Sequence, residues 1–70
     1  MKLHAYTKGH LARLYFPDSA EHVATNRLAR WINRNPALLE ALRQCGYQPR
    51  NRCFTVRQVQ IIIHHLGEPD

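Results

Sequence analysis

Residues that start or stop helices recur along this chain at intervals that leave room only for short helices. Pro17 closes one segment, Asn35-Pro36 opens another, and Gly46 and Gly67 follow the last two. Proline disfavours helical geometry in the residue before it, asparagine is a preferred N-cap, and glycine commonly follows the last helical residue. The sequence therefore predicts four helices, near residues 8–15, 19–34, 36–45 and 56–66.

Side chains able to cap a helix support three of these starts. Thr7 precedes the first helix as its N-cap, and Thr55 with Gln58 forms a regular capping box before the last helix. Asp18 followed by Glu21 is a variant of the same motif, which places the start of the second helix at residue 19. Such side chains accept hydrogen bonds from backbone N–H groups that the first helical turn leaves unpaired.

Apolar residues recur three and four positions apart within each segment, as one buried helix face requires. With 70 residues, 44% of them hydrophobic, the chain has the composition of one globular domain spanning residues 1–70. We expect an all-α, compact four-helix fold. Between Tyr47 and Phe54, Pro49 and Asn51 favour either a turn or a minimal β-hairpin wing, and the pattern does not decide between them. The predicted core is Leu11, Leu14, Tyr15, Ala24, Leu28, Trp31, Ile32, Leu38, Leu42, Val59, Ile62, Ile63 and Leu66.

No catalytic or metal-binding motif accompanies this pattern. The sequence lacks a glycine-rich phosphate loop and a nucleophile elbow, and its cysteines and histidines do not form a CxxC or HxxxH pair. We therefore expect no enzyme activity, cofactor, metal or small-molecule substrate. An apolar segment long enough for a signal peptide or a membrane span is also missing, which favours a cytoplasmic location. There, Cys45 and Cys53 are expected to be reduced packing residues.

Positive charge is concentrated in the middle of the chain. The formal net charge is +5, but residues 22–67 hold seven arginines against Glu40 alone, a net charge of +6. Within the predicted helix 19–34, one side carries the apolar residues, and an arc about 120° away carries Asn26, Arg27, Arg30 and Arg34. Arginine suits planar contacts to phosphate, so the segment has the features of a DNA-recognition helix with an apolar face and a basic face.

Two functions follow from this arrangement. The first is a nucleic-acid-binding helix-turn-helix module in which helix 19–34 reads duplex DNA and Arg50 and Arg52 contact phosphates. The second is a protein-interaction or homodimerising module with no nucleic-acid role. Its candidate contacts are Val23 and Ile61, whose helical positions lie away from the predicted core. The basic arc is equally compatible with an ordinary solvated helix face.

Two stretches resemble regulators of the mercury-resistance and phage-excisionase type. They are Tyr6-Thr7-Lys8-Gly9-His10-Leu11-Ala12-Arg13-Leu14 and Arg52-Cys53-Phe54-Thr55-Val56-Arg57-Gln58-Val59. In those regulators such stretches form the opening helix and the passage from the wing to the next helix. The resemblance implies a winged helix-turn-helix with helix 19–34 in the major groove and residues 48–53 as the wing. The chain departs from that pattern by the extra helix 36–45 and by having no dimerising coiled coil after the last helix.

A closer resemblance covers nearly the whole chain. Leu14-Tyr15-Phe16-Pro17, Arg30-Trp31-Ile32-Asn33, Gly46-Tyr47, Phe54-Thr55 with Gln58-Val59, and the ending Leu66-Gly67-Glu68-Pro69 carry it. These motifs are similar to those of a family of short proteins from gut anaerobes that is described as a domain of unknown function. That resemblance implies a compact helical fold and transfers no activity.

Overall fold

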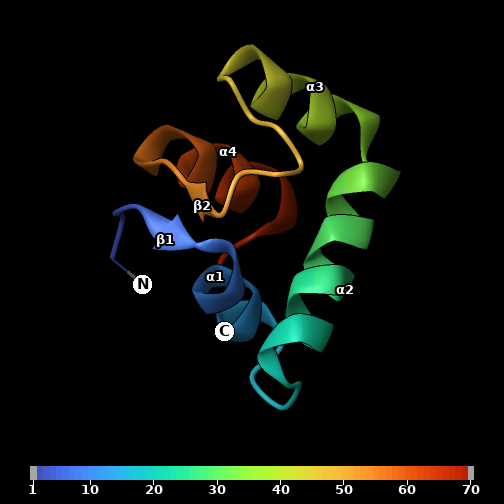
Figure 1. The fold of residues 1–70 in the computed structure, drawn as a ribbon. Coiled ribbons are helices and arrows are strands. Elements are labelled where there is room, and N and C mark those ends of the chain that lie inside the picture. Colours follow the sequence, from blue (N-terminus) through green and yellow to red (C-terminus); the bar gives the residue numbers. More distant parts are fainter. Residues whose placement is uncertain (1, 70) are drawn as a thin grey trace.

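The computed structural model describes residues 2–69, which form four helices and one pair of very short strands (Figure 1). The expected all-α, four-helix fold is confirmed. Within residues 2–69, no helix is long and apolar enough to cross a membrane. In chain order the elements are β1 (Tyr6–Thr7), α1 (Lys8–Tyr15), α2 (Glu21–Arg34), α3 (Pro36–Gln44), β2 (Cys53–Phe54) and α4 (Val56–Leu66).

Capping side chains fix the starts of α1, α3 and α4 where the sequence predicted them. The Thr7 hydroxyl accepts a hydrogen bond from the His10 N–H at 3.0 Å, and the Asn35 side chain accepts one from the Leu38 N–H at 3.2 Å. Thr55 and Gln58 complete the expected capping box. Each bond satisfies one backbone donor that would otherwise be unpaired, so these three helices start at defined residues.

The second helix starts later than predicted. It begins at Glu21 instead of residue 19, and its N-cap is Ala20, which offers no capping side chain. Asp18 does not cap it, because the Ser19 N–H donates to the Phe16 carbonyl at 3.1 Å and holds residues 16–19 in a turn. The third helix, α3, ends at Gln44, one residue earlier than predicted. Gly46 follows with a φ of 80°, a conformation that favours glycine.

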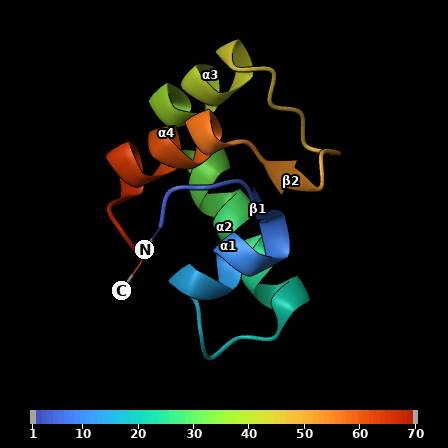
Figure 2. The ribbon, with the colours of Figure 1, turned by 90° about the vertical axis from the view of Figure 1, so that its left-hand side faces the viewer.

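The short strands pair across almost the whole length of the chain. Tyr6 lies opposite Phe54 and Thr7 opposite Cys53 in an antiparallel pair, and the Lys8 N–H donates to the Arg52 carbonyl at 2.8 Å. Figure 2 shows β1 and β2 side by side. A strand therefore does form at the end of the 47–54 segment, but its partner is the N-terminal segment. The wing considered from the sequence, with both strands inside 47–54, does not form.

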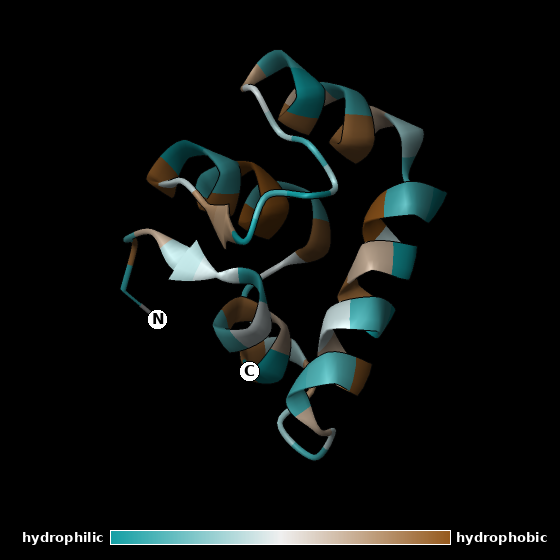
Figure 3. Cartoon of the chain, viewed as in Figure 1, coloured by the Kyte–Doolittle hydropathy of each residue, from teal (hydrophilic) through white to brown (hydrophobic). Residues whose placement is uncertain are grey.

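The core gathers one face of every helix together with residues outside the helices. Along α2 and α3, hydrophobic and hydrophilic segments alternate as expected for amphipathic helices (Figure 3). Most of the predicted core is confirmed as buried: Leu11, Ala24, Leu28, Ile32, Leu38, Leu42, Val59 and Ile62. Others pack partly buried against it: Leu14, Tyr15, Ile63 and Leu66. The sequence analysis omitted five buried hydrophobic residues, Tyr6, Ala12, Phe16, Tyr47 and Phe54, and the buried Gln58.

Trp31 is the one predicted core residue that the structure places at the surface, where its side chain is 41% exposed. At about 100° per residue, Trp31 lies about 60° around the helix from Leu28, at the edge of the buried face. Its indole packs edge-on against the Phe16 ring, with centroids 4.7 Å apart, and more distantly against Tyr15. The prediction of a central, fully buried tryptophan is therefore wrong.

Two side-chain hydrogen bonds connect helices that are distant in sequence. Gln58, only 2% exposed, donates from Nε2 to the Cys45 carbonyl at 3.1 Å and so ties α4 to the end of α3. The Tyr15 hydroxyl donates to the Gly67 carbonyl at 2.6 Å and ties the end of α1 to the end of α4.

Candidate nucleic-acid interface

Three arginines occupy the outer face of α2, which we define as Val23, Arg27, Arg30 and Arg34. Positions three and four apart share one side of a helix. Because Ala24, Leu28 and Ile32 are buried against the core, this side points to solvent, and all three arginines are exposed.

The three arginines differ in how firmly their side chains are held. Arg27 donates from Nη1 to the Ser19 hydroxyl at 3.2 Å, and its guanidinium lies 4.4 Å from the centre of the Phe16 ring. Arg30 and Arg34 have no side-chain partner within residues 2–69, and none of the three contacts a carboxylate there. The outer face therefore carries two freely extended guanidinium groups and one that is already oriented.

Apolar side chains border these charges. Val23 is 40% exposed on the outer face, as expected from its helical position, and Trp31 lies next to that face on the side toward α1. Ile61 does not join them, because it is partly buried and packs against the core. The expectation that Ile61 is an exposed contact residue is therefore wrong. Its position lies off the most buried line of α4, but neighbouring elements still cover it.

The other three predicted site residues lie elsewhere. Asn26 faces a cavity between α2 and the segment that leads to β2, on the side of the helix adjoining the outer face. Arg50 follows Pro49, which lines the same cavity, and donates from Nε to the Gln48 side chain at 2.9 Å. Arg52 is exposed. The structure therefore brings Arg27, Arg30 and Arg34 together on one face. Asn26 lines the cavity, and Arg50 and Arg52 belong to the segment before β2 without lining it.

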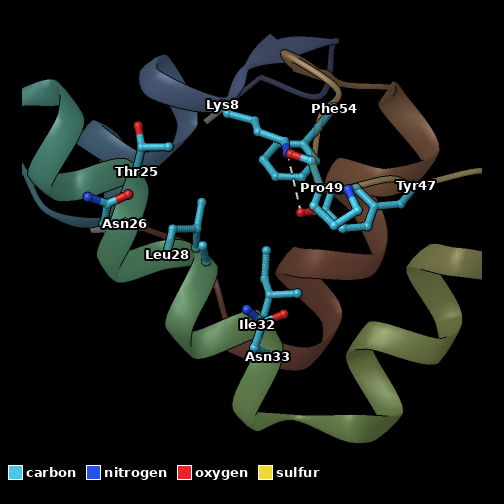
Figure 4. Close-up of a pocket in the computed structure, with 10 residues that line it drawn as sticks. Lys8, Thr25, Asn26, Leu28, Ile32, Asn33, Tyr47, Pro49 and Phe54 are labelled. Carbon is cyan, nitrogen blue, oxygen red and sulfur yellow. Dashed lines mark hydrogen bonds between the residues drawn. The ribbon is translucent and has the colours of Figure 1, made fainter.

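The cavity has a volume of about 210 Å³ and is lined by ten residues (Figure 4). It contains the one lysine of the helices, Lys8, whose ammonium donates to the Pro49 carbonyl at 2.7 Å and to the Tyr47 hydroxyl at 3.3 Å. Burial lowers the pKa of Lys8 from its ordinary value and raises the pKa of the Tyr47 hydroxyl. No pattern in the sequence indicates this cavity, because its walls come from four separate segments.

The potential metal ligands do not converge. Within residues 2–69, no group of three histidine, cysteine or acidic side chains is arranged to hold a metal ion. Both cysteines are free thiols, with Cys45 partly buried and Cys53 exposed on β2. Cys53 is thus not the packing residue that the sequence analysis expected, because alternate residues of a strand face opposite sides and Phe54 takes the buried side.

Comparison with known proteins identifies a family. A family model with the description "Domain of unknown function (DUF4248)" matches residues 2–69. No curated protein and no solved structure is detectably similar to the chain.

Proposed function

The chain belongs to the DUF4248 family, and we propose that it binds duplex DNA through the outer face of α2. The observation that supports this is the set of exposed guanidinium groups at Arg27, Arg30 and Arg34, none of which contacts a carboxylate within residues 2–69. Guanidinium groups that contact no carboxylate are available for bidentate contacts to phosphate, Arg30 and Arg34 with all their donors and Arg27 with those that its bond to Ser19 leaves.

The dimensions of α2 suit this role. From Arg27 to Arg34 the helix rises about 10 Å, which corresponds to about three nucleotides of one DNA strand. The excess of ten lysines and arginines over five acidic residues adds a general attraction to a polyanion. A cytoplasmic location, as expected from the sequence, would give the domain access to nucleic acid. The winged mode of binding is not part of the proposal, because β2 pairs with β1 and α3 lies between α2 and β2.

A salt titration tests the proposal. Binding of a labelled random-sequence duplex, followed by fluorescence anisotropy, should weaken steeply as salt rises, because each arginine that neutralises a phosphate releases counterions. For three arginines, the slope of log affinity against log salt should be about −3. Absence of binding at about 50 mM salt with micromolar protein would contradict the proposal.

A double variant locates the contact. Replacing Arg30 and Arg34 by alanine should flatten the slope by about two units. Both are exposed and unpartnered, so the free energy of unfolding should change by no more than about 0.5 kcal/mol. The matched control replaces Arg43 of α3 and Arg57 of α4, which are also exposed, and should leave the slope unchanged. Equal flattening in both variants would move the contact away from α2.

A protein partner or a second copy of the chain is the second candidate, favoured by two exposed large hydrophobic side chains on α2, Val23 at 40% and Trp31 at 41%. Exposed apolar clusters on a small domain often mark interfaces. Sedimentation over a range of concentrations should then show a dimer that Val23→Asp abolishes. A monomer at every concentration would remove the homodimer from consideration.

A further inference from the structure

The cavity beside α2 is closed on its inner side by apolar groups. Leu28 and Ile32 reach into it from α2, and Tyr47, Pro49 and Phe54 form the facing wall (Figure 4). The Tyr47 and Phe54 rings are nearly parallel, with an interplanar angle of 17° and centroids 5.7 Å apart. A flat hydrophobic group would meet apolar surface on both sides of this space.

One positive charge lies in the wall of this space. The Lys8 ammonium is 4.7 Å from the centre of the Tyr47 ring and 5.7 Å from that of Phe54. Its two hydrogen bonds, to the Pro49 carbonyl and the Tyr47 hydroxyl, use two of the three donors of an ammonium group. One N–H therefore remains for a ligand, and the position of the nitrogen is already fixed.

The remaining polar groups of the wall come from α2. Asn26 and Asn33 both line the cavity, and their carboxamides form no hydrogen bond within residues 2–69. The Thr25 hydroxyl donates to the Glu21 carbonyl at 2.8 Å and keeps its acceptor capacity. No acidic residue is among the cavity's lining residues, although Glu21 borders the shallower depression on the other side of Asn26. The lining therefore carries a net positive charge.

We propose that this cavity binds a small aromatic carboxylate, with the ring between α2 and the Tyr47–Phe54 wall and the carboxylate on the Lys8 ammonium. A protein cavity of about 150 Å³ can hold benzene, so the volume of about 210 Å³ here leaves room for one six-membered ring and a carboxylate. The carboxylate supplies the acceptor that the free ammonium N–H lacks, and the two asparagines offer further donors. The sequence analysis expects no small-molecule substrate. The proposal differs from that expectation in naming a small molecule, but one that is bound and not chemically changed.

This site is separate from the proposed DNA contact, since none of Arg27, Arg30 and Arg34 lines the cavity. Failure of one proposal therefore leaves the other intact.

Benzoate is the probe for this site, and its neutral isostere benzamide is the comparison. In a titration followed by amide NMR, benzoate should shift the signals of Thr25, Ala29 and Asn33 saturably, with a dissociation constant of about 1 mM, as suits a ligand of about nine non-hydrogen atoms. Benzamide should bind at least about tenfold more weakly, because it lacks the charge that pairs with Lys8. No saturable shift, or equal binding of the two compounds, would overturn the proposal.

Two variants with matched controls place the ligand in the cavity. Ala29→Met fills the space from α2 and should abolish the benzoate shifts, whereas Ala37→Met, at an exposed position of α3, should leave them unchanged. Lys8→Met should weaken benzoate binding about tenfold or more, and Lys2→Met, an exposed lysine outside the lining, should not. Because Ala29→Met retains every Lys8 contact, undiminished binding in that variant would overturn the proposal even if Lys8→Met failed to fold.

Discussion

Replacing Gln58 by alanine should destabilise this domain more than any other single change to a polar side chain that we consider. Within residues 2–69, Gln58 is the polar residue that is fully buried, and its side chain makes two hydrogen bonds at once. Its Oε1 accepts from the Thr55 N–H at 3.0 Å, and its Nε2 donates to the Cys45 carbonyl at 3.1 Å. The variant would lose both bonds.

The expected loss is about 3 kcal/mol of unfolding free energy. The helix-capping part accounts for about 1 kcal/mol. The Cys45 carbonyl, left without its donor beside the core, accounts for about 1 kcal/mol or more, and the loss of buried methylene groups for a similar amount. For a domain of this size, about 3 kcal/mol corresponds to a fall in the thermal midpoint of about 12–24 °C.

Thermal unfolding followed by circular dichroism measures the effect against two reference variants. Thr55→Ala removes the hydroxyl that accepts from the Gln58 N–H but keeps both bonds of the Gln58 side chain, and should cost only about 1 kcal/mol. Gln60→Ala, at an exposed position of α4, should change stability by no more than about 0.5 kcal/mol. If Gln58→Ala costs no more than Thr55→Ala, then the connection from α4 to α3 contributes nothing and the reasoning is refuted.

Three further predictions concern other residues. In thermal unfolding, Ile32→Ala should cost about 2–5 kcal/mol and Trp31→Ala only about 1–2 kcal/mol, because Ile32 is 1% exposed and Trp31 41%; the reverse order would contradict the observed core. Burial, with a smaller effect of Glu68, raises the pKa of Tyr15 to about 12, above its unfolded value of about 10. The resulting stabilisation is complete below about pH 10 and is lost as pH rises toward 12, so the free energy of unfolding in urea should fall across this range. It should fall less in Tyr15→Phe, where only the raised pKa of Tyr47 still contributes. Gly46→Ala should lower the free energy of unfolding by about 1 kcal/mol in the same assay, because its φ of 80° is strained for alanine. No steric clash adds to this loss, because the space around the missing Cβ is open.

Local signals in the sequence predicted most of the helical structure. The bounds of α1 and α4 were predicted at both ends, because Thr7, Thr55 and Gln58 act on backbone groups only three residues away. The predicted start of α2 was wrong because a second local structure competes with the capping motif. Asp18 begins a capping motif, but residues 16–19 form a turn instead. The sequence pattern does not show which of these two local structures is more stable.

Features that depend on contacts distant in the chain could not be predicted. The burial of Tyr6 and Phe54 follows from their pairing in β1 and β2, and nothing near either residue indicates its partner. The candidate sites divide in the same way. Exposure of Arg27, Arg30 and Arg34 follows from helical periodicity, which was available. The cavity around Lys8 depends on how four segments pack, and no pattern in the sequence shows that packing.

The β1–β2 pair has a consequence for how the chain is made. The ribosome adds Tyr6 early, and its cross-strand neighbour Phe54 follows only after α1, α2 and α3 have been synthesised. Until then, α1 and α2 can form and pack, but Tyr6 has no strand to join and Lys8 no carbonyl from residue 52. Closure of the core must therefore wait for β2, so a ribosome stalled before residue 53 would expose an unfinished core with Tyr6, Leu28 and Ile32 uncovered, the kind of surface that chaperones bind.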